Sequence, residues 1–204
     1  ALCGTDGEQV TVNANNIPNE NRGGLAKFSS AGPRSGDSAV RPNVTAPGFS
    51  VLSADVGSGN LGRIESGTSM AAPHVAGVAA LAVQAHPDWD AQEIAASLVN
   101  TADPEKVSGY DPALAGGLVD PAEAVGASLV AYGDSSDVNG TVVREPGLSF
   151  GYAESATTFE ATRKVTLVNK GAEAAQITAG SQPAEKSKKA SISFSQEWIT
   201  VPAG

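Results

Sequence analysis

The chain has 204 residues, of which 41% are hydrophobic and 17% charged, a balance that suits one large folded domain or two small ones and argues against wholesale disorder. The formal net charge of −9 disfavours nucleic acid and anionic membranes as partners, because both require a basic face. One cysteine, Cys3, and two histidines, His74 and His86, exclude an internal disulfide and a His-rich metal site, so no metal or cofactor is predicted.

No apolar run reaches the ~18 residues of a membrane span, and no signal peptide is visible. The chain opens without a methionine, in the middle of a pattern, and we expect it to be a piece of a longer protein.

The first 65 residues read as short strands separated by loops. Apolar patterning predicts strands at residues 9–14 and 25–30 and around residues 50–54. Asn, Gly and Pro in the intervening stretches predict turns, and residues 55–62 form a Gly-rich loop.

Residues 70–85 are apolar on nearly every side and carry no charge, which predicts a helix buried all round. Proline is tolerated only in the first turn of a helix, where its missing N–H has no partner to lose. Pro73 therefore predicts a helix that begins between Ser69 and Pro73.

Two further helices are predicted after this one. Asp90 and Glu93 have the spacing of a capping box, so an amphipathic helix is expected over residues 90–102. Residues 116–132 predict a turn and a third, shorter helix, with Pro121 near its start.

The pattern changes after about Tyr132, where a polar, turn-rich stretch predicts a boundary. Its segment 134–140 has oxygen ligands but not the spacing of a calcium loop, so we interpret it as a linker turn. Period-two alternation then predicts an antiparallel all-β module, with strands within residues 148–152, 163–169 and 191–201 and a turn at 169–171. It has too few strands to close a sandwich, and we expect it to be cut short.

The stretch SGTSMAAPHVAG, residues 66–77, places Ser69 at the start of the apolar helix. The first N–H groups of a helix lack partners and carry partial positive charge. A hydroxyl placed there can attack a carbonyl, and the oxyanion that forms would find donors in place. Gly67 permits a tight turn and Thr68 adds a second hydroxyl. The pattern favours a serine nucleophile, and the alternative is that Ser69 is only an N-cap.

The longer string SGTSMAAPHVAGVAAL resembles the serine motif of the subtilisin-like serine proteases, the subtilases. FSSAGP (residues 28–33) and RPNVTAPG (residues 41–48) resemble the two segments that precede this motif, and GGLVDPAEAV resembles the end of the catalytic domain. The resemblance covers about residues 9–130. The β region resembles the fibronectin-III-like domain of some large secreted members. The matching positions in the motif are Gly67, Thr68, Ser69, Met70, Ala71, Pro73, His74, Val75, Ala76 and Gly77.

This resemblance implies an α/β fold, with part of a mainly parallel sheet that has helices on both faces, followed by a partial all-β sandwich module. Residues 1–132 would be the C-terminal part of a subtilisin-like peptidase domain, residues 133–147 a linker, and residues 148–204 a truncated fibronectin-III-like domain.

It also implies a secreted serine endopeptidase that cleaves polypeptides through an acyl-enzyme on Ser69, without a cofactor. The backbone N–H of Ser69 would join the oxyanion hole, with Thr68 and Gly67 in support.

The chain departs from the family pattern upstream of the serine, where subtilases carry an aspartate, a histidine in an HGT motif and an oxyanion asparagine. No HGT motif is present. His74 lies five residues after Ser69, and we interpret it as a packed, hydrogen-bonded core histidine. His86 lies ~24 Å along the helix, in a loop. The remaining candidates are interpreted as loop or turn residues: Asp6, Asp55, Asn13, Asn15 and Asn16.

We therefore expect the 204-residue chain to be inactive alone and to need the missing upstream half of its own catalytic domain as a partner. The alternative is a non-catalytic pseudoprotease, or a binding or structural module that keeps the fold without the chemistry.

Overall fold

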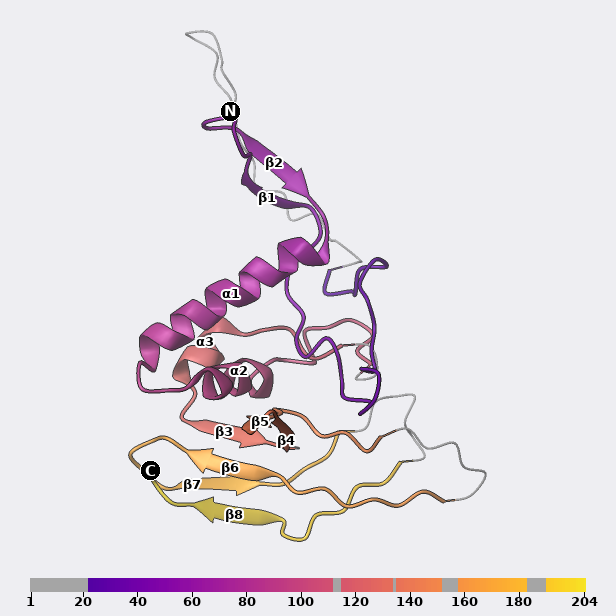
Figure 1. Ribbon diagram of the computed structural model, residues 1–204, viewed down its shortest axis with the longest axis vertical. Coiled ribbons are helices and arrows are strands. Elements are labelled where there is room, and N and C mark those ends of the chain that lie inside the picture. Colours follow the sequence, from indigo (N-terminus) through magenta and orange to yellow (C-terminus); the bar gives the residue numbers. More distant parts are fainter. Residues whose placement is uncertain (1–21, 112–114, 134, 152–157, 183–189) are drawn as a thin grey trace.

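The computed structural model describes residues 22–111, 115–133, 135–151, 158–182 and 190–204. A β-hairpin projects from one end, three helices form the middle, and the remaining strands lie at the other end (Figure 1). The predicted strand at residues 9–14 lies outside the described residues. Within the described part of the chain, no helix is both long enough and apolar enough to cross a bilayer.

The projecting hairpin consists of β1 (Val51–Ala54) and β2 (Gly62–Glu65), paired antiparallel. The strand predicted around residues 50–54 is thus confirmed, as is the Gly-rich loop after it. The strand β2 was not predicted, because its four residues follow glycines and show no clear alternation. The strand predicted at residues 25–30 is wrong: this segment is loop, and its nearest pairing is an isolated bridge from Gly24 to Ser108.

The three helices are α1 (Thr68–Ala85), α2 (Ala91–Asn100) and α3 (Pro121–Gly126). The capping box predicted for α2 is confirmed, since Asp90 accepts from the N–H groups of Gln92 and Glu93 and the Glu93 carboxylate accepts from Asp90 N–H. Pro121 opens α3 at its first turn, as expected. The main core joins these helices through Val78, Ala82, Ile94, Leu98, Val119 and Ala124.

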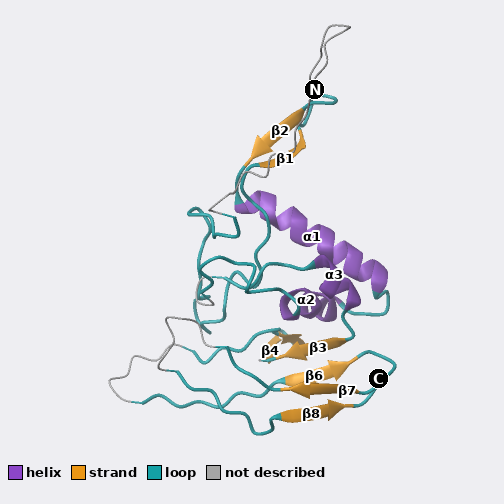
Figure 2. Cartoon of the chain, turned by 180° about the vertical axis from the view of Figure 1, so that it is seen from behind, coloured by secondary structure: helices purple, strands orange, loops and turns teal. Residues whose placement is uncertain are grey.

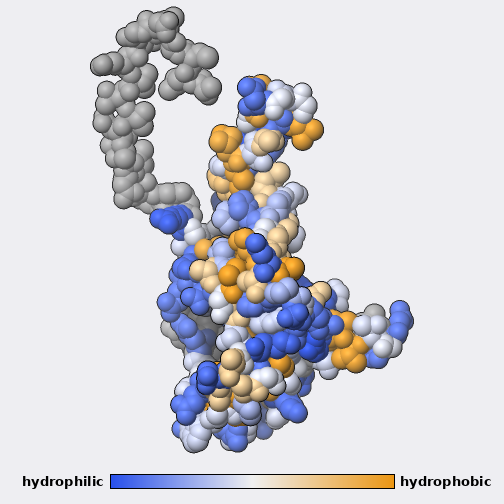
Figure 3. Space-filling view, turned by 90° about the vertical axis from the view of Figure 1, so that its left-hand side faces the viewer, coloured by the Kyte–Doolittle hydropathy of each residue, from blue (hydrophilic) through white to orange (hydrophobic). Residues whose placement is uncertain are grey.

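The expectation that the first helix is buried all round is wrong for the described structure. Only Val78 and Ala82 of α1 are buried, while Leu81 and Val83 are 49% and 52% exposed. The helices α2 and α3 cover one side of α1, and no other described element covers the opposite side. Apolar surface is consequently visible on the projecting hairpin and on the body beneath it (Figure 3).

The remaining strands form three antiparallel pairs: β3 (Leu129–Tyr132) with β6 (Thr166–Asn169), β4 (Ser135–Val138) with β5 (Thr141–Arg144), and β7 (Ala175–Thr178) with β8 (Trp198–Val201). The predicted turn at residues 169–171 connects β6 to β7.

Three expectations for this region need correction. The helix predicted within 116–132 ends at Gly126, and the β-branched and aromatic residues after it form strand β3. The segment 134–140 is not only a linker turn, because it contains strand β4 and a tight turn at Asn139 and Gly140, whose φ angles of 54° and 82° suit a hairpin. Residues 148–151, predicted as strand, are loop.

The mainly parallel sheet expected from the family resemblance is not seen among the described residues. Their named strands all pair antiparallel, and the parallel pairings are isolated bridges, Gly24 to Ser108 and Thr45 to Leu118. The observed mixture of helices and strands is consistent with the α/β class.

The strands β3 and β4 lie next to α2 (Figure 2), and polar contacts join the β region to the N-terminal end of this helix. The Arg144 guanidinium lies 2.6 Å from the Asp90 carboxylate. The backbone N–H of Arg144 donates to Gln92 Oε1 at 2.8 Å. Lys170 Nζ lies 2.8 Å from the buried Glu93 carboxylate. The charges that cap α2 therefore also attach the β region to the helices.

We predict that Gly116→Ala strongly destabilises the fold. A Cβ at this position would lie 1.6 Å from the Asn43 carbonyl oxygen, so two backbone segments would have to move apart. The expected loss is about 1–3 kcal/mol or more in the free energy of unfolding, measured by urea denaturation. The control is Gly126→Ala, where the added Cβ meets no atom within 4 Å. Equal stability of the two variants would contradict the described packing.

We also predict loss of stability in acid. Hydrogen bonding to Arg34 lowers the pKa of Asp37, and hydrogen bonding to Lys106 lowers the pKa of Asp120. At Asp90 burial acts to raise the pKa, but the Glu93 N–H and the Arg144 charge outweigh it and lower the pKa.

A carboxylate whose pKa is lower in the folded state adds stability above its unfolded pKa of about 3.9, and this contribution is lost as the pH falls through the folded pKa. The free energy of unfolding should therefore decrease below about pH 5. Asp90→Asn should flatten this decrease, whereas Asp88→Asn, at an exposed residue of the same loop, should leave it unchanged. If the free energy of unfolding decreased equally in acid in the two variants, Asp90 would make no contribution to the decrease.

Candidate active site

Ser69 lies in the first turn of α1, as its second residue. The N-cap is Gly67, which has an extended backbone and makes no side-chain capping hydrogen bond. The alternative that Ser69 serves as the N-cap is therefore wrong, because its backbone is already helical. Both Ser69 and Thr68 are exposed.

The turn before Ser69 is held by backbone contacts with the segment that leads into β1. Gly67 N–H donates to the Gly48 carbonyl at 2.8 Å, and the Gly67 carbonyl accepts from Met70 N–H at 3.0 Å. Ser66 Oγ accepts from the N–H of Ser50 at 2.8 Å. A Cβ on Gly48 would lie 2.8 Å from the Gly67 oxygen and 3.1 Å from Ala71 Cβ, so this close approach requires glycine at position 48.

The N-terminus of α1 is an open cluster of donors. In the part of the chain that the structure describes, the N–H groups of Thr68 and Ser69 have no acceptor. The first turn contains no acidic residue, so no side-chain charge offsets the partial positive charge of the helix end. An oxyanion that formed beside Ser69 Oγ would find these donors unoccupied.

Pro73 is the sixth residue of α1, so the expectation that it lies in the first turn is wrong. The helix begins at Thr68, before the predicted interval. Proline has no N–H to donate, and in a helix this N–H would bond to the carbonyl four residues earlier, which is that of Ser69. The hydrogen bond that the helix loses is therefore one that would involve Ser69 itself.

The two histidines do not approach Ser69. His74 is hydrogen-bonded, as expected, with Nδ1 2.8 Å from the Met70 carbonyl oxygen, but it is exposed and is not a core residue. Residues five apart on a helix point about 140° away from each other, so the His74 ring is directed away from Ser69. His86 follows α1 in a loop, as expected, where its ring stacks on Trp89 at 4.0 Å.

Asp55 is the one other acid or amide candidate that the structure describes. Asp55 lies in the loop between β1 and β2, as expected, with Oδ1 4.0 Å from the Arg63 guanidinium. The remaining candidates lie outside the described residues: Asp6, Asn13, Asn15 and Asn16.

The structure adds residues that the sequence motif did not single out. The guanidinium groups of Arg34 and Arg41 both contact the Glu145 carboxylate, at 3.0 and 2.9 Å. This cluster fixes the loop before Gly48 against the segment after β5. A hydrophobic pattern could not reveal this cluster, because Glu145 lies more than 100 positions from both arginines in the sequence.

The sequence is similar to those of known peptidases. Residues 7–126 match the model of the subtilase family of peptidases. The chain is 37% identical over 131 residues to the subtilisin-like protease SBT3.4 of Arabidopsis thaliana, an alignment that covers 55% of this chain and 17% of the relative. It is 36% identical over 138 residues to SBT4.4 and 37% identical over 138 residues to SBT1.5, both subtilisin-like proteases of the same plant. These alignments cover 59% and 62% of this chain and 19% and 17% of the relatives.

The chain thus spans less than a fifth of the length of these relatives. The family match covers more than half of the 204 residues and includes the helix that carries Ser69. The chain therefore belongs to the subtilase family.

Proposed function

We propose that the protein to which this chain belongs is a secreted serine endopeptidase and that Ser69 is its nucleophile. The observation that carries the proposal is that Ser69 is exposed at the start of α1, where the N–H groups of Thr68 and Ser69 have no acceptor in the described part of the chain. The relatives are named as proteases, which favours catalysis over a pseudoprotease.

The chemistry would be acyl transfer to and from Ser69. The Ser69 oxygen attacks a peptide carbonyl while a base takes its proton, and the carbonyl oxygen becomes an oxyanion that accepts hydrogen bonds from the first turn of α1. The protonated base then gives this proton to the leaving nitrogen, the C–N bond breaks to release the amine product, and an ester remains on Ser69. Water then hydrolyses the ester by the same steps in reverse. Thr68 lies beside this site, and Gly67 sets the turn that presents it.

The base and its aspartate would come from residues outside these 204. His74 is directed away from Ser69, and His86 is stacked on Trp89 beyond the far end of the helix. The uncovered apolar side of α1 supports a second part of the catalytic domain packed against it, because Leu81 and Val83 gain nothing from exposure to water. We propose that this part is the upstream half of the domain and that it contributes the strands of a mainly parallel sheet.

We further propose that residues 1–132 belong to the peptidase domain, that residues 133–147 connect it to an accessory domain, and that residues 148–204 are part of a fibronectin-III-like sandwich. The antiparallel pairs β3–β6 and β7–β8 support a β domain. The pairing of β3 with β6 supports contact between Leu129–Tyr132, at the end of the peptidase domain, and this accessory domain.

We predict that a fluorophosphonate probe labels Ser69 in the full-length protein and hardly at all in the 204-residue chain. A serine hydroxyl is a weak nucleophile without an adjacent base, and loss of the base costs several orders of magnitude in rate. Labelled peptides would be identified by mass spectrometry, with Ser69→Ala as the control. Strong labelling of Ser69 in the short chain would mean that the base lies within it, and no labelling of the full-length protein would favour the pseudoprotease.

We predict that Gly48→Ala slows labelling of Ser69 in the full-length protein by at least about tenfold, because displacement of Gly67 misplaces the nucleophile. The control is Gly77→Ala, within α1 itself, where an added Cβ meets no atom within 4 Å. Equal labelling rates for the Gly48→Ala variant and the wild type would show that this contact does not position Ser69.

A further inference from the structure

The segment between the two proposed domains makes contacts in two directions through adjacent residues of opposite charge. Arg144 is the last residue of β5, and Glu145 follows it directly. Successive side chains of a strand point to opposite sides. Arg144 contacts the start of α2, and Glu145 contacts the loop that carries Arg34 and Arg41. The end of β5 is therefore held on both sides.

On the α2 side, a side-chain amide and an ion pair hold the backbone of β5. Gln92 Nε2 donates to the Val142 carbonyl at 3.2 Å, and Gln92 Oε1 accepts from Arg144 N–H at 2.8 Å. The amide of Gln92 thus pairs with the edge of β5 as the backbone of a neighbouring strand would. The Arg144 guanidinium lies 2.6 Å from the Asp90 carboxylate and 4.5 Å from the centre of the Tyr132 ring, which adds a charge-assisted and a cation–π contact.

On the other side, the Glu145 carboxylate accepts from two guanidinium groups. Arg41 Nη2 lies 3.0 and 2.9 Å from its two oxygens, and Arg34 Nη2 lies 3.0 Å from one of them. Arg34 also pairs with Asp37, whose carboxylate accepts from Ala39 N–H at 3.1 Å. Only 18% of the Glu145 side chain is exposed, so these charge-assisted hydrogen bonds are partly shielded from water. One carboxylate therefore fixes the conformation of this loop.

The two ends of the segment meet. Gly133 N–H donates to the Glu145 carbonyl at 2.9 Å. A Cβ on Gly133 would lie 2.1 Å from the Gly147 carbonyl oxygen, so the backbones at these two glycines are in contact. Because residues 133–147 leave and return to the same place, they do not act as a spacer that separates two domains.

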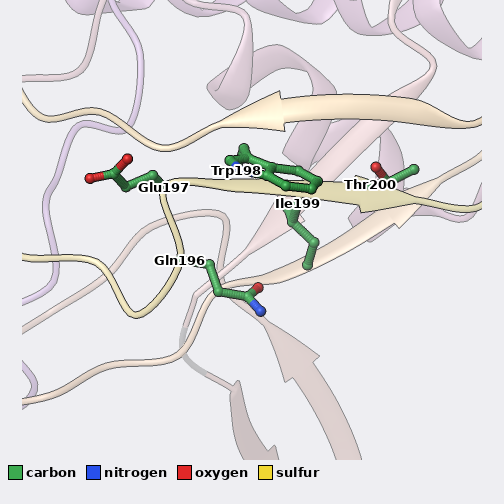
Figure 4. A pocket seen from close by; sticks show the side chains of 5 residues that line it. All are labelled: Gln196, Glu197, Trp198, Ile199 and Thr200. Carbon is green, nitrogen blue, oxygen red and sulfur yellow. The ribbon is translucent and has the colours of Figure 1, made fainter.

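The strand β8 shows the contrast with β5. Figure 4 shows the Trp198 indole lying along β8 and the Ile199 side chain on the other side of the strand. Trp198 and Ile199 are 66% and 41% exposed. Within the described part of the chain these adjacent residues thus leave both sides of β8 open, whereas Arg144 and Glu145 connect the two sides of β5 to other segments.

We infer that residues 135–147 form a clasp, which fastens the loop at residues 34–41 to the start of α2 and protects the connection between the two domains from proteolysis. The inference rests on the proposed division into domains and is independent of the chemistry of Ser69. A protease cleaves a folded segment only after it opens, so the cleavage rate follows the population of the open form. Opening the clasp breaks the contacts of Arg144 and of Glu145 together, which keeps this population small. A secreted peptidase that meets other proteases, and other copies of itself, would thereby keep its accessory domain attached.

The test is limited proteolysis of the full-length protein by thermolysin, which cleaves before apolar residues such as Val142 and Val143. Every form carries Ser69→Ala, so that the protein's own activity makes no cuts. Mass spectrometry gives the rate of cutting within residues 135–147, and a synthetic peptide of residues 133–149 gives the rate for the open chain. We expect the folded segment to be cut at least about a hundredfold more slowly than the peptide.

Two variants open the clasp from its two sides. Glu145→Gln should raise the rate of cutting within the segment at least about tenfold, because both arginines lose their charged acceptor. Its matched control is Glu160→Gln, which removes the same charge from an exposed residue of the β region. Gln92→Ala should also raise the rate, because β5 loses its partner on α2. The matched control for this variant is Gln176→Ala, at an exposed residue of β7.

Three results would overturn the inference: equal rates for the folded segment and the peptide, no increase in either variant over its control, or an increase in one variant alone. The last result would mean that the two sides open independently. Urea denaturation of each variant shows whether it is folded, and Gln92→Ala serves as the test if Glu145→Gln is not. None of these results bears on Ser69, which is tested separately by its reaction with fluorophosphonate.

Discussion

The contact between the backbones of Gly48 and Gly67 determines where the candidate nucleophile lies. It brings the segment before β1 within hydrogen-bonding distance of the N-cap of α1, and a Cβ on Gly48 would lie only 2.8 Å from the Gly67 oxygen. From this contact the chain enters the helix at once, so Ser69 lies in the first turn, where its N–H has no acceptor among the described residues. Geometry of this kind costs little to maintain and stabilises charge only when an oxyanion forms.

The contact is in turn supported from the far side of the molecule. The N–H of Thr45 donates to the Gly117 carbonyl at 2.8 Å, and the Thr45 carbonyl accepts from Val119 N–H at 2.9 Å, which aligns the segment that reaches Gly48. Glu145, which follows β5, holds Arg34 and Arg41 at the start of the same segment. The β region therefore contacts the same backbone segment, residues 34–48, that ends at the turn before Ser69.

Local signals in the sequence predicted what depends on neighbouring residues. The Asp90–Glu93 capping box, the helix after Ser69 and the turn after Asn169 were all predicted, because each is decided within a few positions. Features that depend on residues far apart in the sequence were not predicted. The apolar pattern of α1 indicated burial on every side, yet the described residues cover only one side, and Pro73 lies inside the helix because contacts before Thr68 start the helix early.

The most direct test of the account is the structure of the full-length protein with a peptidyl boronic acid, which forms a tetrahedral adduct with a catalytic serine. We predict a covalent bond from boron to Ser69 Oγ, with one boronate oxygen within hydrogen-bonding distance of the Ser69 N–H and a histidine from outside residues 1–204 beside Oγ. An adduct on another residue, or a boronate oxygen directed away from the start of α1, would contradict the assignment of this helix end as the oxyanion site.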